Sequence, residues 1–370
     1  MVFSTEDSSV KKILVILTGG TICSGPNENA KNQSQAEKAE KYIISDFKKS
    51  ASPYKDMDFD TVKLEKDILS ENMTVSVWNK LIDIFRDKSI WTKYSGVIVL
   101  HGTDTLAYTS SLLSVLLAGA PIPICMVSAQ LPLMKSGKVP KKESRTNGYA
   151  NFRASVELIM NGIAPNVYVV YRNIANDKHR PGSLFVHLGS HLLQCKNYSN
   201  NFYSKDQVKI KNTKNAQWEG VKFETDTFYL DKIKELKDSV LLIMPYVGLK
   251  YSRINIDGAD AVVHGTYHSD TVCVERKFRN EKYGDSSGLY LVDCCKEKGI
   301  SLFLAPCDAE AYSYDSTGDA LEHGAEYISD TTLELAYVKT LIGCSMDLKG
   351  KELKEFLGCS INYDFAYKKQ

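Results

Sequence analysis

Short apolar runs alternate with longer amphipathic stretches along the first half of the chain. The runs are four or five residues long and rich in β-branched residues. Continuous runs of this kind are typical of strands that are buried on both faces of a parallel sheet. We therefore predict strands at Ile13–Leu17, Val97–Leu100, Ile124–Val127 and Val167–Tyr171.

The stretches between these runs have helical spacing. In Val75–Lys88 the apolar residues recur three or four positions apart, which predicts a helix with one buried face. We predict further helices over Thr109–Ala118 and Tyr149–Met160. Strands that are separated by helices predict an α/β domain with a mainly parallel sheet flanked by helices.

The pattern changes between Asn197 and Asp238, where the chain is polar and rich in Lys and Asn. We interpret this stretch as a connection that includes some strands, followed by a second, smaller α/β domain. The predicted division is residues 1–205, a connecting segment 206–238, and residues 239–370. The second domain is predicted to contain strands Ser239–Pro245, Ala261–Val263 and Ser301–Ala305, helices Ile254–Ala259 and Leu289–Lys298, and a helix after Ser329 with Asp330 as its N-cap.

Length and composition agree with two globular domains, because 370 residues exceed what one hydrophobic core usually supports. Lys plus Arg number 46 and Asp plus Glu 45, so net charge predicts neither a nucleic-acid partner nor an anionic membrane. The nine cysteines lack metal-ligand spacing, which favours reduced thiols and no metal. The run Ile13–Leu17 is too short for an export signal, and no run could span a bilayer, so we expect a cytoplasmic protein.

The first candidate site is the sequence Leu17–Ile22 (LTGGTI), directly after a predicted strand. In open α/β sheets, ligands bind beyond the carboxyl ends of the strands. Two glycines allow a tight turn close to a ligand, and Thr21 would present its hydroxyl there. An ordinary strand-ending turn is the alternative. The sequence is neither a P-loop nor a dinucleotide-binding fingerprint.

The second candidate is His101–Thr105 (HGTDT), which also follows a predicted strand and precedes a predicted helix. Thr103 and Asp104 would lie where helix N–H groups converge, a position that favours a polarised or anionic substrate group. A carboxylate beside a hydroxyl can orient an amino group or support proton transfer. Simple capping of the helix by Thr103 or Asp104 is the alternative.

Together, TGGTI and HGTDT resemble the two motifs of the asparaginase/glutaminase family, and both are intact here. The resemblance implies that Thr21 is the nucleophile, that Thr103 is the second threonine, and that Asp104 holds the substrate amino group. It also implies that Ser70 and Glu71 contact the substrate carboxylate and amine. Active sites in this family lie between subunits, so a homodimer or homotetramer is implied, with no cofactor.

The chain departs from the family in two places. The family has a lysine that activates the second threonine, and here an ungapped comparison offers His187, whereas a small gap offers Lys178. The flexible-loop tyrosine of the family has no close match, and Tyr42 is the nearest candidate. The segment Ser24–Lys41 is polar, which suits a mobile lid and a disordered insertion equally.

The predicted function is hydrolysis of L-asparagine to L-aspartate and ammonia, with N–H groups near Gly20 and Thr103 as oxyanion donors. Alternatives are an amidase acting on L-glutamine or another small amide, and a catalytically inactive amino-acid-binding homologue. A tRNA-dependent amidotransferase subunit is disfavoured, since TGGT starts within the first 25 residues and the charge is balanced. The loop His264–Asp270 is expected to face a neighbouring subunit's site, because Gly265 disfavours a helical metal pair of His264 with His268.

Overall fold

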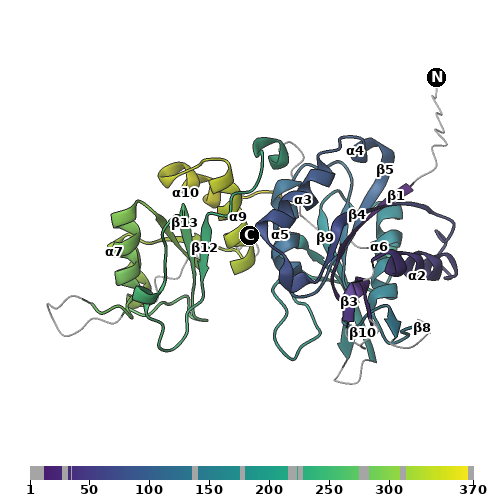
Figure 1. The fold of residues 1–370 in the computed structure, drawn as a ribbon, viewed down its shortest axis with the longest axis horizontal. Helices are drawn as coiled ribbons and strands as arrows, with labels where there is room; N and C mark the ends of the chain where they lie inside the picture. Colours follow the sequence, from purple (N-terminus) through teal and green to yellow (C-terminus); the bar gives the residue numbers. More distant parts are fainter. Residues whose placement is uncertain are drawn as a thin grey trace.

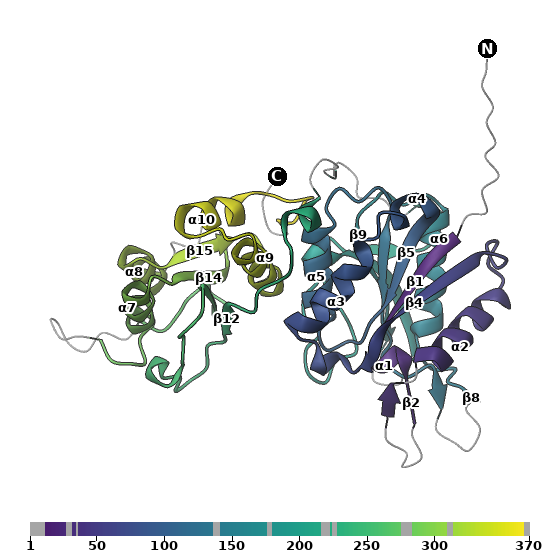
Figure 2. The same cartoon turned by 45° about the horizontal axis from the view of Figure 1, so that its top comes forward.

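The fold contains two main sheets, each covered by helices, that lie side by side (Figures 1 and 2). The computed structural model describes residues 12–26, 32–34, 36–135, 141–175, 180–215, 223, 228–274, 283–308 and 314–365. The seven-stranded sheet belongs to the N-terminal part and the four-stranded sheet to the C-terminal part. This architecture confirms the predicted fold class, a larger α/β unit followed by a smaller one.

The seven-stranded sheet has the order β11-β10-β9-β6-β5-β1-β4, and its five strands from β9 to β4 are parallel. β10 runs antiparallel to both β9 and β11. All four strands predicted for this region are present, as β1, β5, β6 and β9. The bounds are β1 Lys12–Gly19, β4 Asp58–Ile68, β5 Tyr94–Leu100, β6 Ile124–Val127, β9 Val167–Ala175, β10 Arg180–Leu188 and β11 Val208–Ile210.

Helices cover both faces of this sheet, which explains why its central strands are continuously apolar. α2 (Ala36–Lys48) and α6 (Gly148–Met160) pack on one face, and α3 (Val75–Phe85) and α5 (Leu106–Leu116) pack on the other. Alternate residues of β1 enter the two cores, Ile13 on the α6 side and Leu14 on the α5 side. The predicted helices correspond to α3, α5 and α6.

Short elements complete the N-terminal part. The described residues of the segment Ser24–Lys41 form an antiparallel hairpin and the start of α2. The helical turns are α1 Gly20–Cys23, η1 Ser70–Asn72, α4 Ile90–Lys93, η3 Gly189–His191 and η4 Thr213–Asn215, and the two hairpins are β2 Ser24–Pro26 with β3 Asn32–Ser34 and β7 Met134–Lys135 with β8 Lys141–Lys142.

The four strands of the second sheet are parallel, in the order β12-β13-β14-β15. α7 (Gly288–Lys298) and α8 (Asp315–His323) pack on one face, and α9 (Leu333–Ser345) and α10 (Gly350–Gly358) pack on the other. α9 also packs against α5, so one helix contributes to both units. The bounds are β12 Val240–Ile243, β13 Ala261–Gly265, β14 Ser301–Cys307, β15 Glu326–Ser329, α7 Gly288–Lys298, α8 Asp315–His323, α9 Leu333–Ser345 and α10 Gly350–Gly358.

Two local predictions for this region are wrong. Ile254–Ala259 is not a helix: a 3-10 turn, η6 (Tyr251–Arg253), precedes it, and Gly258 then adopts a left-handed φ of 80°. The Asn255 side chain accepts a hydrogen bond from the backbone N–H of Asp257, a local bond that competes with a helix. Thr332, not Asp330, caps α9 through a 3.1 Å bond from the amide of Leu335.

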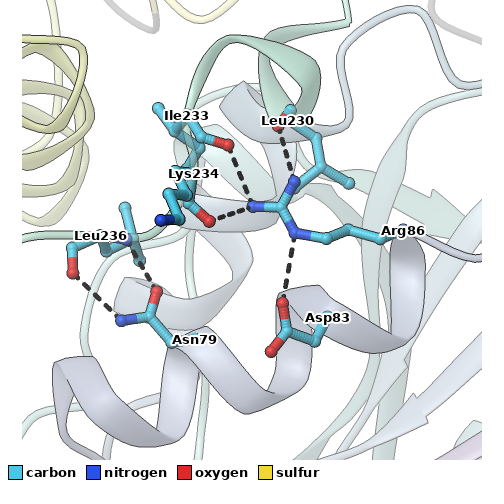
Figure 3. Close-up of polar contacts among 7 residues, drawn as sticks. All are labelled: Asn79, Asp83, Arg86, Leu230, Ile233, Lys234 and Leu236. Carbon is cyan, nitrogen blue, oxygen red and sulfur yellow. Dashed lines mark hydrogen bonds and ion pairs between the residues drawn. The ribbon is translucent and has the colours of Figure 1, made fainter.

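The connection between the two sheets is fastened to α3 (Figure 3). Its first part supplies β11 to the N-terminal sheet. Further along, the Arg86 guanidinium donates to three backbone carbonyls, those of Leu230, Ile233 and Lys234. Asn79 donates to the carbonyl of Leu236 and accepts from its amide, at 3.0 and 2.7 Å. The chain at and after η5 (Tyr229–Lys232) is therefore held by Asn79 of α3 and by Arg86, the residue that caps the C-terminus of α3.

Over the residues that the structure describes, no helix combines the length and the apolar character needed to cross a bilayer.

Candidate active site

Three loops meet at the carboxyl edge of the N-terminal sheet. β1 lies between β4 and β5, and all three strands run in the same direction. Their carboxyl ends lead into Gly20 and Thr21, into Ser70, and into Thr103 and Asp104 respectively. The topology therefore brings together residues that are up to about eighty positions apart in the sequence.

Two glycines allow these loops to touch. Gly20 has a φ of 76°, and a Cβ built on it would lie 2.2 Å from the Cα of Gly102. A Cβ on Gly102 would in turn lie 2.4 Å from the Oγ of Ser70. No side chain fits at either position without movement of the backbone or of Ser70. The motif glycines thus place Thr21 and Thr103, the residues that follow them, on adjoining loops.

Ser70 joins the loop after β4 to the loop after β5. Its Oγ donates a 2.8 Å hydrogen bond to the Oδ2 of Asp104 and accepts a 3.2 Å bond from the amide of Asp104. The hydroxyl of Thr105 donates to the carbonyl of Ser70 at 2.9 Å. Ser70 is buried, whereas Asp104 is exposed. The Asp104 carboxylate is therefore oriented by a buried hydroxyl and is accessible to a ligand from solvent.

The hydroxyl of Thr18 donates to the carbonyl of Leu100 at 3.0 Å and fastens β1 to β5 just before the two loops begin. The Ser24 hydroxyl donates to the carbonyl of Gly20 at 2.8 Å. Thr21 and Thr103 are both half-buried, a degree of exposure that leaves their hydroxyls available to a small ligand. Hydrogen bonds therefore fix the backbone next to the predicted pair of threonines, Thr21 and Thr103.

Buried His101 supports the second loop. Its Nδ1 lies 2.8 Å from the carbonyl oxygen of Gly102, which identifies Nδ1 as the protonated donor. Burial lowers the pKa of His101 to about 4, so the imidazole is neutral near pH 7. A neutral imidazole at this point fixes the Gly102 carbonyl without adding a positive charge beneath the site.

The loop between β5 and α5 can stabilise a developing negative charge. Within the described residues, the amide N–H of Thr103 has no hydrogen-bond acceptor. The N-terminus of α5 begins three residues later, and the partial positive charge of a helix N-terminus favours an anion nearby. These features are what an oxyanion site requires.

The structure does not place His187 beside Thr103. His187 pairs in register with Val169 on β9, and β6 lies between β9 and β5. Three strand spacings separate β10 from β5, about 14 Å. The buried imidazole bonds through Nδ1 to the Ser204 hydroxyl at 2.8 Å, and burial lowers its pKa to about 3. His187 is therefore part of the packing of β10, and Lys178 lies outside the described residues.

Glu71 and Tyr42 are brought to different places. Glu71 follows Ser70 in η1 and is exposed near the mouth of the site. Tyr42 lies in the middle of α2, where its phenol acts electrostatically on Tyr149 of α6. α2 packs on the far face of the sheet from α5. In the second sheet, His264 uses both ring nitrogens, Nδ1 toward the carbonyl of Gly265 and Nε2 toward the phenol of Tyr251.

The structure adds one contact that sequence reasoning missed. The side-chain amide of Gln194 donates to the carbonyl of Asp104, and the backbone amide of Gln194 donates to the carboxylate of Glu334 at 3.1 Å. Glu334 lies in the first turn of α9 and is buried, and burial raises its pKa. The Asp104 loop is therefore linked to the C-terminal unit. No motif marks Gln194, so only the fold reveals this link.

The two-sheet architecture, with threonines on glycine-hinged loops at one sheet edge, defines a class of α/β proteins with a candidate hydroxyl-based active site. The family model described as "Asparaginase, N-terminal" matches residues 12–218, more than half of the chain. The chain therefore belongs to the asparaginase family.

Curated relatives carry two kinds of name. An L-asparaginase of Thermococcus kodakarensis is 30% identical over 206 residues, which cover 54% of this chain and 56% of the relative. A glutamyl-tRNA(Gln) amidotransferase component of Methanosphaera stadtmanae is 27% identical over 269 residues, 69% of this chain and 56% of the relative. The matched part thus spans just over half the length of these two relatives.

Solved structures share the fold over nearly the whole chain. The thermostable L-asparaginase from Thermococcus kodakarensis has a TM-score of 0.68 at 20% identity, and covers 96% of this chain and 100% of its own. L-asparaginase I from Vibrio cholerae has a TM-score of 0.66 at 18% identity, covering 96% and 99%. At these identities the likeness shows the fold alone.

Proposed function

We propose that the protein hydrolyses the side-chain amide of a small amino acid, with L-asparagine as the substrate and L-aspartate and ammonia as products. The observation that carries the proposal is the contact of Gly20 with Gly102, together with the Ser70–Asp104 hydrogen bond. These contacts assemble two half-buried threonines and one oriented carboxylate at a single sheet edge. Membership of the asparaginase family supports the same reaction.

In this mechanism the Oγ of Thr21 attacks the amide carbon of the substrate. The Thr21 proton passes to the leaving nitrogen, the C–N bond breaks, ammonia leaves, and an ester on Thr21 remains. Water then cleaves the ester, releases aspartate and restores the hydroxyl. The N–H groups near Gly20 and Thr103 would stabilise the oxyanion of both tetrahedral intermediates.

The remaining residues would bind the substrate. The Asp104 carboxylate would hold the α-ammonium group, Ser70 the α-carboxylate, and Glu71 the amine from the exposed side. The Thr103 hydroxyl would assist proton transfer at the reacting carbon. With His187 placed elsewhere, Lys178 remains the proposed partner that activates a threonine.

The test is ammonia release from the purified chain with L-asparagine and, separately, with L-glutamine. Thr21→Val should abolish release, since valine keeps the shape of threonine and lacks the hydroxyl. Thr92→Val on α4, at an exposed threonine outside the site, is the matched control and should retain full activity. Activity of the wild-type chain that persists in Thr21→Val would disprove the role of the nucleophile.

Two other functions are distinguished by the same assay. Release from L-glutamine alone would identify a glutaminase-type amidase. Binding of L-asparagine without ammonia release would identify an inactive amino-acid-binding homologue. The likeness to glutamyl-tRNA(Gln) amidotransferase components supports one more candidate, an amidase whose ammonia release rises when glutamyl-tRNA and a partner protein are added.

A further inference from the structure

A cationic groove lies along α6, on the part of the N-terminal unit where α6 packs beside α2, and α6 lies away from the C-terminal sheet (Figures 1 and 2). It has two lobes of about 460 Å³ each. One lobe lies between α6 and α2, and the other between α6 and the strand pair β10–β11. The wall that the lobes share is formed by Ala150, Arg153 and Arg172.

The two arginines of this shared wall are not held in ion pairs within the described part of the chain. Arg153 is exposed on α6, and Arg172 is half-buried on β9. Neither guanidinium forms an ion pair or a side-chain hydrogen bond with any residue that the structure describes. The Nε of Arg172 is buried and has no hydrogen-bond partner among those residues. Burial lowers the pKa of Arg172, and the positive charge of Arg153 lowers it further, so the two groups repel each other.

Two acidic groups near the groove are paired with other cations, and a third bonds to a hydroxyl. The Glu143 carboxylate accepts hydrogen bonds of 3.0 and 2.9 Å from the Arg145 guanidinium. Asp46 is paired with Lys142. Glu157, in the second lobe, accepts a 3.2 Å bond from the Thr213 hydroxyl. No carboxylate of the described residues forms an ion pair with Arg153 or Arg172.

Lys209 and Lys211 add two exposed ammonium groups to the second lobe. The whole chain carries a formal charge of only +1, so this excess is local. A half-buried guanidinium beside a second one is unfavourable unless an anion lies between them. Arginine forks match the oxygens of phosphate in geometry, and such bonds are among the strongest hydrogen bonds in proteins.

We propose that this groove binds a small phosphate-bearing ligand, with Arg153 and Arg172 contacting one phosphate group from two sides. Lys209 and Lys211 would receive a second phosphate of a pyrophosphate or nucleotide in the adjoining lobe. The positive groups converge in a hollow instead of following a long surface stripe, which favours a compact ligand over a nucleic acid. The inference goes beyond amide hydrolysis and does not depend on it.

The experiment is calorimetric titration of the full chain with inorganic phosphate, pyrophosphate and ATP at constant ionic strength. One equivalent should bind, and Arg153→Gln should weaken binding about ten- to hundredfold, the usual effect of losing a charged hydrogen bond. Arg153 is exposed, so this variant should fold normally. Lys234→Gln, which removes an exposed positive charge on the connection beside α3, is the control and should bind like the wild type.

The three probes distinguish the sources of the phosphate. Equal affinity for phosphate and pyrophosphate assigns one phosphate position, and tighter binding of pyrophosphate or ATP assigns two. Absence of binding by all three probes overturns the proposal, as does an equal loss in Arg153→Gln and Lys234→Gln. Binding of single-stranded RNA that depends on Arg153 and that pyrophosphate does not displace would also overturn it, in favour of a nucleic-acid surface.

Discussion

The Ser70 hydroxyl is the contact that orients Asp104, since it donates to the carboxylate and accepts from the amide of the same residue. In Ser70→Ala we expect the KM for L-asparagine to rise about five- to tenfold with a smaller change in kcat, because Asp104 loses the bond that orients it toward the α-ammonium group and the α-carboxylate loses its proposed contact with Ser70. Ser252→Ala removes a comparable bond to Asp285 in the C-terminal part and should leave both constants unchanged. A fall in kcat alone would contradict the assigned role.

Buried histidines, among them His101, His187 and His264, make stability sensitive to acid. Burial lowers the pKa of His101 and His264 to about 4 and that of His187 to about 3. As pH falls from about 6.5 toward 4, these histidines bind protons in the unfolded chain but stay neutral in the folded chain. The free energy of unfolding therefore falls. Each buried histidine contributes a slope of about 1.4 kcal/mol per pH unit in that window.

Urea unfolding at pH 7, 6 and 5 measures this slope. His187→Gln should reduce the slope of the free energy of unfolding against pH by the contribution of one histidine, about 1.4 kcal/mol per pH unit. This holds whatever the effect of the substitution on stability at pH 7. His268→Gln, at an exposed histidine, should keep the wild-type slope. Identical slopes in the wild type and in His187→Gln would mean that folding does not shift the pKa of His187.

At the scale of elements, α3 holds the connection between the two sheets through Arg86 and Asn79 (Figure 3). Arg86→Ala leaves the carbonyls of Leu230, Ile233 and Lys234 without this donor. We expect a loss of about 1–3 kcal/mol in the free energy of unfolding, measured by urea denaturation. Arg253→Ala, on the exposed turn η6, is the control, and an equal loss there would refute a specific clamp.

Element prediction from the sequence succeeded where one physical signal dominates. β1, β5, β6 and β9 are covered on both faces, so each gives an unbroken apolar run. β4 (DFDTVKLEKDI) lies at the sheet edge, and its alternating charges conceal it. The apolar residues around the turn Asn255–Gly258 happen to have helix-like spacing. Ile254 and Ile256 are apolar because they pack into the core, not because they line one face of a helix.

The site was partly predictable for a related reason. Thr21, Thr103 and Asp104 follow buried strands within recognisable motifs, and the sheet edge places such loops together. The contact between Gly20 and Gly102 and the bond from Gln194 to Asp104 depend on strand order and on residues 90 positions apart. The distance of His187 from Thr103 is not predictable, because sequence spacing does not show the register between β9 and β10.

At the scale of the whole molecule, a buried ion pair fixes the end of the described chain against α9. Lys339 and Asp364 are each 1% exposed and bond at 2.7 Å. Asp364→Ala leaves a buried ammonium group without its partner, and we expect a loss of about 3–5 kcal/mol in the free energy of unfolding. Lys339→Met combined with Asp364→Leu should recover most of it. A double variant as unstable as Asp364→Ala would show that packing, not charge, is responsible.

The last prediction concerns assembly into a homodimer or homotetramer. After β12 the chain exposes Tyr246 and Val247, which are 61% and 97% accessible, beside the loop that begins at Gly265. Clustered exposed apolar side chains on a globular protein favour a contact with another chain. We expect light scattering to show an oligomer for the wild type and a monomer for Tyr246→Asp combined with Val247→Asp. Tyr198→Asp, at a fully exposed tyrosine of the N-terminal part, should leave the oligomer intact.

If the loop His264–Asp270 completes a neighbour's site, the monomeric variant also loses ammonia release, whereas an active monomer would show that each chain holds a complete site.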